Sequence, residues 1–290
     1  MFAKLLRLVP ALVLLGTVVQ SAPISRSITH NDFSCRSDAH PNPVVLFHGL
    51  GATYYEDINL LEANLQSKGF CTFSITYGEY DLFPLVGGLK AIAESSIELA
   101  DFVKEVHRKT GASKVDLVGH SEGAFQTLYV TKFGGVSDIV QRVFAIAPPT
   151  HGTSFAGLNN ITDVASQVTK PTLAAALQTF GCPACSDLLP NGTAVEKLND
   201  GPIAQEGVSY TILTSKYDEL VTPTTTSFVR EDGVRNLYVQ DFCPADTVGH
   251  IGETYDANVW TLVSNTLQDD FSGPEKCVIG PSESEVGSAS

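Results

Sequence analysis

Positively charged residues are scarce in this sequence. It contains 18 lysines and arginines against 32 aspartates and glutamates, which gives a formal net charge of −14 at pH 7. An acidic surface repels nucleic acid phosphates and anionic lipid headgroups. We therefore exclude nucleic acid as a partner, and we exclude docking to a membrane through a basic patch.

The sequence also lacks an apolar run of the roughly 20 residues needed to span a bilayer. Its longest run, of about 12 apolar residues, follows Lys4 and Arg7 and is followed by small residues. This pattern predicts that residues 1–21 are a cleaved signal peptide and that the protein is secreted; a membrane anchor is the alternative. Because residues 1–21 hold two positive charges and no acidic residue, cleavage would change the net charge from −14 to −16.

Cysteine is present in an even number, and in a secreted chain this predicts disulfide bonds. The C-x-x-C pair does not follow a thioredoxin-like βαβ pattern, and a zinc site would need two further ligands. We therefore expect neither a redox motif nor a metal site. The sequons at Asn160 and Asn191 predict surface glycosylation. The six cysteines are Cys35, Cys71, Cys182, Cys185, Cys243 and Cys277.

Short, almost continuously apolar runs alternate with helical repeats along the chain. Runs of this kind are typical of strands that are buried on both faces of a parallel sheet. The order predicts a doubly wound, mostly parallel α/β sheet with helices on both faces and a ligand site at the carboxyl ends of the strands. The predicted strands span residues 43–48, 71–77, 114–119, 142–148, 208–214 and 235–240, and the clearest helical repeats lie at 58–65 and 92–106. We expect the second helix to end before Gly111.

The interval of about 150–207 is too long for an ordinary connection between two strands. It is either an insertion that acts as a cap or lid, or a crossover helix with long loops. Within it, Pro171 is suited to the start of a helix. Leu173, Leu177 and Phe180 would then share one face of that helix.

The stretch GHSEGA contains a candidate nucleophile, Ser121. The pentapeptide G-x-S-x-G is weak alone, but here it follows a predicted strand and precedes a helix-compatible run, as in a nucleophile elbow. Side chains two residues before and after the serine would collide in such a turn, which explains Gly119 and Gly123. We interpret Ser121 as a catalytic nucleophile rather than a structural turn residue.

A serine needs a base and an acid that orients the base. In this fold the acid follows a late strand and the histidine follows the last one. His250 lies in such a late loop, and Asp218 directly follows the strand at 208–214. We predict the triad Ser121, Asp218 and His250, with Glu219 as the alternative acid.

The developing oxyanion requires backbone N–H donors. The residue after the nucleophile, Glu122, supplies one, and the loop after the first strand supplies the other. Because His48 and Gly49 allow a tight turn there, we predict that the second donor is the Leu50 N–H.

Taken together and in order, several segments resemble the secreted class 2 lipase family of the α/β-hydrolase superfamily. The resemblance covers about 30–268 and implies an α/β-hydrolase fold, an esterase acting on acylglycerols without a cofactor, and the same triad and oxyanion residues. Two residues of GHSEGA, Glu122 and Ala124, depart from the commoner GHSQGG, and the extension after 268 is unfamiliar. The segments are PVVLFHGLGATYYEDINLLEANLQSKGFCTFSITYG, GHSEGA, PPTHGT, YDELVTP and DFCPADTVGHIG.

The resemblance also favours local disulfides, namely Cys35 with Cys71, Cys182 with Cys185 and Cys243 with Cys277. It further implies a catalytic domain over 22–268. Residues 269–290 would then form a tail that is tethered by a disulfide and disordered at its end.

We therefore expect a secreted, monomeric serine ester hydrolase, most simply a triacylglycerol lipase with an acyl-enzyme intermediate. The alternatives are a cutinase-like or short-chain esterase, a non-catalytic hydrolase-like binding protein, and a peptide hydrolase. Acyl chains would lie against the apolar part of the insertion and residues 82–86. The sequence does not give the depth of such a groove.

Overall fold

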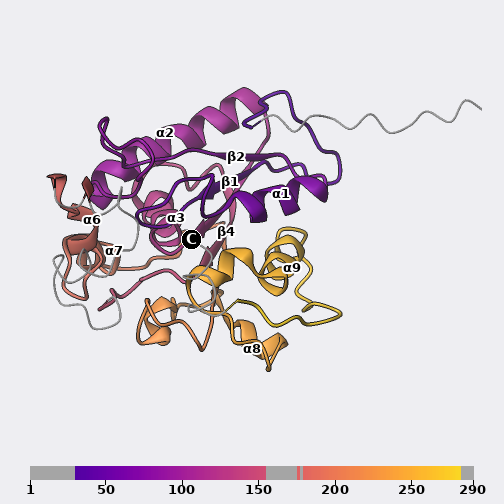
Figure 1. The fold of residues 1–290 in the computed structure, drawn as a ribbon. Helices are drawn as coiled ribbons and strands as arrows, with labels where there is room; N and C mark the ends of the chain where they lie inside the picture. The colour runs from indigo at the N-terminus through magenta and orange to yellow at the C-terminus, as the bar shows by residue number, and fades with distance from the viewer. Residues whose placement is uncertain (1–29, 155–174, 177–178, 282–290) are drawn as a thin grey trace, which may run out of the picture.

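The computed structural model describes residues 30–154, 175–176 and 179–281. Within them, six strands form one sheet in the order β2-β1-β3-β4-β5-β6, and all neighbouring strands are parallel (Figure 1). The doubly wound sheet expected from the sequence is thereby confirmed. The strands are β1 (Val44–Phe47), β2 (Thr72–Ser74), β3 (Val115–His120), β4 (Val140–Ile146), β5 (Ser209–Thr214) and β6 (Arg235–Tyr238).

Segments that contain α-helices or a 3₁₀ turn connect the strands, since two parallel strands need a crossover connection. The described α-helices are α1 (Asn59–Ser67), α2 (Ile92–Thr110), α3 (Glu122–Phe133), α6 (Pro183–Asp187), α7 (Thr193–Leu198), α8 (Val239–Phe242) and α9 (Ala257–Thr266). Two 3₁₀ turns, η1 (Thr224–Ser227) and η2 (Ile251–Tyr255), lie in the C-terminal half.

The apolar strands bury side chains on both faces because successive residues of a strand point in opposite directions. In β1, Val45 and Phe47 belong to one hydrophobic cluster, whereas Val44 and Leu46 belong to the other. All four side chains are fully buried. A continuously apolar strand is therefore what a sheet covered on both faces needs.

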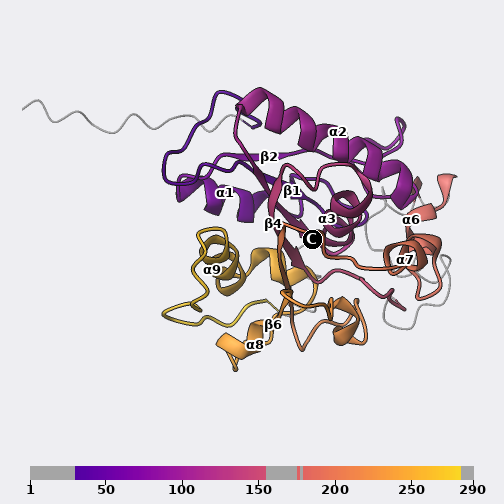
Figure 2. The same cartoon turned by 180° about the vertical axis from the view of Figure 1, so that it is seen from behind.

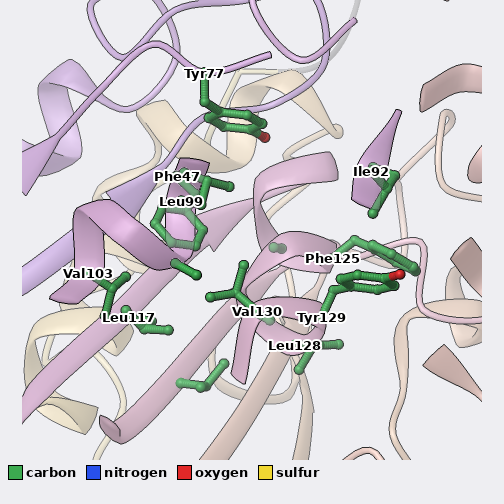
Figure 3. Packing of buried hydrophobic residues seen from close by; sticks show 14 of the residues in the cluster. Phe47, Tyr77, Ile92, Leu99, Val103, Leu117, Phe125, Leu128, Tyr129 and Val130 are labelled. Carbon is green, nitrogen blue, oxygen red and sulfur yellow. The ribbon is translucent and has the colours of Figure 1, made fainter. Parts of the chain in front are cut away.

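One face of the sheet is covered by α2 and α3, and the other by α1 and α9. Figure 3 shows the first layer, where Leu99 and Val103 of α2 and Phe125 of α3 pack with Phe47 and Leu117. In the second layer, Leu61 of α1 and Leu262 of α9 pack in the opposite cluster. The pair α1 and α9 lies side by side in both views of the ribbon (Figures 1 and 2).

The ends of the helices follow local signals in the sequence. Helix α2 ends at Gly111, which takes a left-handed conformation with φ +67°. A residue with a Cβ pays a steric penalty there, so glycine is favoured. The predicted end of this helix is therefore confirmed.

The long interval 150–207 is described only in part. Short helices α6 and α7 occupy its second half, and Thr153 N donates to the Leu188 carbonyl oxygen at 2.9 Å. The predicted helix from Pro171, with Leu173 and Leu177, lies outside the described residues, so the alternatives of lid and crossover remain predictions. None of the helices in the described residues is both long enough and apolar enough to cross a membrane.

Candidate active site

Ser121 lies on a sharp turn between β3 and α3. Its backbone has φ +54°, a conformation that costs free energy for a residue with a side chain. A Cβ on Gly119 would lie 2.4 Å from the Gly123 carbonyl oxygen, and one on Gly123 would lie 2.3 Å from that of Phe47. The two glycines therefore allow the turn that holds the serine at the edge of the sheet.

Three residues that are distant in sequence meet at this edge. His250 Nε2 lies 2.9 Å from Ser121 Oγ, and His250 Nδ1 lies 2.8 Å from Asp218 Oδ2. Asp218 follows β5, and His250 immediately precedes η2. Both side chains are buried. The three predicted triad residues are therefore close enough for hydrogen bonding in one chain of contacts.

The carboxylate of Asp218 fixes the orientation of the imidazole. Its other oxygen, Oδ1, accepts hydrogen bonds from the backbone N–H groups of Leu220 and Val221 at 2.9 and 2.8 Å. Since a carboxylate accepts, Nδ1 of His250 donates to Oδ2. In the neutral ring, Nε2 is then an acceptor that faces the hydroxyl of Ser121.

The loop after β1 is held by the ring of His48. Its Nδ1 donates to the Gly49 carbonyl oxygen at 2.8 Å, and its Nε2 accepts from the Tyr77 N–H at 3.2 Å. Burial lowers the pKa of His48 to about 4, which keeps the ring neutral for these two roles. Because C=O and N–H of a trans peptide point in opposite directions, the Leu50 N–H faces away from the side of the peptide that His48 contacts.

Glu122 follows the nucleophile and opens α3. Its backbone N–H belongs to the first turn, where helices leave N–H groups without intrahelical partners. The side chain is fully buried, and neither carboxyl oxygen has a hydrogen-bond partner among the described residues. Burial raises the pKa of Glu122 well above its usual range, and the nearby Asp187 adds to this effect.

The six cysteines form three disulfides, Cys35 with Cys71, Cys182 with Cys185 and Cys243 with Cys277. This is the pairing that the resemblance implied. Within the described ranges, no cluster of three or more histidine, cysteine, aspartate or glutamate residues has an arrangement suited to a metal ion.

The residues predicted to contact acyl chains are only partly described. Phe180 stacks on Tyr80 with ring centroids 4.3 Å apart and meets Phe83 edge-on. Leu82 and Leu85 are exposed. Leu173, Leu177 and the sequon residue Asn160 lie outside the described residues, whereas Asn191 is exposed in the turn before α7.

One buried polar residue near the site is not apparent from the sequence. Asp57 lies at the start of α1, where an aspartate is typical of a helix N-cap. In the structure it makes no such cap but contacts Gly49 and His120. Its position depends on contacts between distant segments, which local sequence patterns do not reveal.

The chain is similar to several proteins that are described as lipases. A family model described as Lipase (class 2) matches residues 41–259. Triacylglycerol lipases from Pseudarthrobacter phenanthrenivorans and Burkholderia plantarii are each 32% identical over 122 residues, which is 39% of this chain and 35% and 31% of theirs. The match therefore spans about a third of the length of these curated relatives.

Among solved structures, Aspergillus fumigatus lipase B superposes with a TM-score of 0.64 at 20% identity, covering 80% of this chain and 54% of that one. The propeptide form of Bacillus licheniformis lipase BlEst2 gives 0.60 at 18% identity, covering 84% and 54%. These similarities show the α/β-hydrolase fold. Because the family model matches most of the sequence, the chain belongs to the class 2 lipase family.

Proposed function

We propose that this protein is a serine carboxylic-ester hydrolase, and specifically a triacylglycerol lipase. The observation that carries the proposal is the continuous chain of contacts from Asp218 Oδ2 through the His250 ring to Ser121 Oγ, with distances of 2.8 and 2.9 Å. Membership of the class 2 lipase family supports the reaction type. The names of the curated relatives support the triacylglycerol substrate.

In the proposed reaction, Ser121 Oγ attacks the ester carbonyl carbon while His250 Nε2 takes the hydroxyl proton. The tetrahedral intermediate collapses, the bond to the alcohol breaks, and His250 gives the proton to the leaving alcohol. A water then attacks the acyl-enzyme with His250 again as the base. The fatty acid is released, and the serine regains its proton.

The negative charge on the carbonyl oxygen needs preorganised donors, and the loss of one donor costs about 3 to 4 kcal/mol in the transition state. We assign this role to the backbone N–H groups of Leu50 and Glu122. The orientation of the peptide between Gly49 and Leu50, fixed by the His48 ring, supports the first assignment. The place of Glu122 in the first turn of α3 supports the second.

For the acyl chain, we propose a wall formed by residues 82–86 and Phe180. The contacts of Phe180 with Tyr80 and Phe83 bring these two apolar segments together. Burial of an acyl chain contributes about 0.8 kcal/mol per CH₂ group, so the length of this wall would set the preferred chain length. Leu173 and Leu177 remain candidates for the same wall.

We further propose that the protein is secreted after cleavage of residues 1–21. Three disulfides among the described residues support an oxidising compartment. The catalytic domain would comprise 22–268, followed by the tail at 269–290. Glycosylation at Asn160 and Asn191 and a monomeric state complete this proposal.

Labelling with a fluorophosphonate tests the nucleophile. We expect the native protein to be labelled at Ser121 and the Ser121→Ala variant to remain unlabelled and inactive. Ser113→Ala is the matched control, because Ser113 is exposed in the loop before β3 and should have no effect. Absence of label and of ester hydrolysis in the native protein would contradict the proposed function.

A profile of rate against acyl chain length tests the substrate class. A lipase should hydrolyse emulsified long-chain triacylglycerols at rates at least comparable to those for soluble short esters. A preference confined to short esters or to polyesters would replace the lipase proposal with the short-chain or cutinase-like esterase. The proposed serine chemistry is common to both.

A further inference from the structure

Three catalytic segments come from different parts of the fold: the loop after β1 with Leu50, the turn at Ser121, and the loop that carries His250. These segments must keep a fixed relative position for the proposed reaction. Asp57 lies between them, is only 6% exposed, and has no role in the proton transfers described above.

The Asp57 carboxylate contacts all three segments. Its Oδ2 accepts a hydrogen bond from the Gly49 N–H at 2.6 Å, one residue before Leu50. His120 Nδ1, one residue before Ser121, lies 3.0 Å from both carboxylate oxygens. The Thr254 hydroxyl, in η2 just after His250, lies 3.3 Å from Oδ1.

His120 extends this cluster to the backbone of the catalytic base. Its Nε2 lies 3.1 Å from the His250 carbonyl oxygen, and the two imidazole rings are 4.8 Å apart. A carbonyl oxygen only accepts, so Nε2 carries a hydrogen. Nδ1 faces the Asp57 carboxylate, so the His120 ring links this carboxylate to the backbone of the proposed base.

The surrounding atoms leave little room for movement. A Cβ on Gly49 would lie 3.3 Å from Asp57 Oδ2 and 3.3 Å from the Ser121 Cβ. Burial alone would raise the pKa of Asp57, but His120 and the Gly49 N–H outweigh it and hold this pKa below its usual value. The ionised carboxylate is thus the form that the cluster stabilises.

We propose that Asp57 and His120 are positioning residues that hold the oxyanion loop, the nucleophile turn and the His250 loop in one arrangement. This inference rests on the proposed function. Neither residue touches the reacting atoms; they act through the backbone at Gly49 and His250. A displacement of about 1 Å between reacting groups can cost about 100-fold in rate.

Two substitutions of Asp57, by alanine and by asparagine, distinguish an effect on the position of the catalytic groups from an effect on the stability of the fold. Alanine removes every contact. Asparagine keeps an oxygen that accepts from the Gly49 N–H and gains an N–H that donates to the Nδ1 of a neutral His120. We expect Asp57→Ala to lower kcat by about 100-fold with little change in KM, since the substrate does not touch this buried group, and Asp57→Asn to recover most of that loss.

We would measure kcat on a soluble short ester, at a temperature well below the melting temperature of each variant. Each rate is then divided by the number of active sites that a fluorophosphonate has labelled when the labelling is complete. Misfolded molecules are then not counted. The matched control is Asp101→Ala, an exposed aspartate on α2, which should keep the native rate. If Asp57→Ala does not fold, His120→Phe takes its place, because it keeps a ring but removes both polar contacts.

A shared role also predicts non-additive effects. In the double variant Asp57→Ala with His120→Phe, kcat should be little lower than in either single variant, because each substitution alone already disrupts the same set of contacts. A kcat per labelled site close to the native value in Asp57→Ala, or in His120→Phe where that variant replaces it, would overturn the inference. Fully additive losses would also overturn it. An inactive, unlabelled native protein would instead refute the proposed function.

Discussion

In the proposed mechanism, the reactivity of Ser121 depends on which tautomer of His250 is present. Asp218 determines the tautomer, because its Oδ1 is held by two backbone N–H groups and its Oδ2 faces the ring. Asp218→Asn should therefore lower kcat by about 10⁴-fold, as expected when an amide favours the wrong tautomer. Hydrolysis of a soluble ester checks this.

The neighbouring Glu219 provides the control for that experiment. It is exposed, and it is the acid that the sequence offered as an alternative. Glu219→Gln should keep the native rate. If Glu219→Gln lowers kcat and Asp218→Asn keeps the native rate, the acid has been assigned to the wrong residue.

The buried carboxyl group of Glu122 predicts a dependence of stability on pH. Burial raises its pKa in the folded protein well above its ordinary value of 4.5. Below pH 4.5 the carboxyl group is protonated in both the folded and the unfolded state, so its ionisation does not change the free energy of unfolding. As the pH rises above 4.5, the unfolded state ionises and the folded state does not, which costs about 1.4 kcal/mol of stability per pH unit until the folded pKa is reached.

Glu122→Gln removes this titration. We expect it to raise the melting temperature more at pH 8 than at pH 5, by calorimetry at both pH values. Since about 1 kcal/mol corresponds to roughly 2 to 4 °C in a protein of 150 to 250 residues, the difference is measurable. Glu196→Gln, at an exposed site on α7, is the control. An equal gain at both pH values would mean that Glu122 is ionised in the folded protein.

At the scale of the elements, the segment Val278–Pro281 packs against the loop before His250, although it lies beyond the family match. Its backbone bonds to the loop before His250: Gly280 N donates to Asp246 Oδ1 at 2.9 Å, and Gly249 N donates to the Pro281 carbonyl oxygen at 3.2 Å. The disulfide between Cys243 and Cys277 anchors the segment. A segment outside the family match thus contacts and supports the loop of the proposed base.

Gly280 is the position where this support is most sensitive. A Cβ there would lie 2.3 Å from Asp256 Oδ2 and 2.9 Å from the Val248 Cβ. Gly280→Ala should cost about 1 to 3 kcal/mol of stability, as overpacking does, and lower kcat because the loop before His250 must shift. Urea unfolding and ester hydrolysis measure the two effects.

The next residue toward the N-terminus serves as the control, because Ile279 is 72% exposed. Ile279→Ala should change neither stability nor rate. If Gly280→Ala behaves like Ile279→Ala, the segment covers the loop without supporting it.

For the whole molecule, the three disulfides should contribute unequally to stability. In the chain-entropy model, a cross-link stabilises more when it closes a longer loop. The bonds Cys35–Cys71 and Cys243–Cys277 have sequence separations of 36 and 34, against 3 for Cys182–Cys185. Removal of either long pair by two Cys→Ala substitutions should cost about 3 to 4 kcal/mol, and removal of the short pair about 2 kcal/mol.

Urea unfolding of the three double variants checks the order, with the short pair as the internal control for the loss of two sulfur atoms. A larger loss for the short pair than for the long pairs would show that native packing around α6, rather than loop closure, dominates.

Local signals in the sequence determined much of this protein. The apolar strands, the glycine at the end of α2 and the strand-turn-helix around Ser121 were predictable, because each depends on residues close together in the chain. Chain order was enough to predict that Asp218 and His250 lie beside Ser121, since parallel strands bring their carboxyl ends to one edge.

Only the tertiary structure decided which distant groups meet behind that edge. Asp57 resembles a helix cap in the sequence, yet it bonds to Gly49 and His120. Gly280 lies in the predicted tail, yet it is buried and packs against Asp256. The physical reason is that hydrogen bonds and close packing act over a few ångströms, so contacts between distant segments follow from the folded path of the chain and leave no periodic pattern in the sequence.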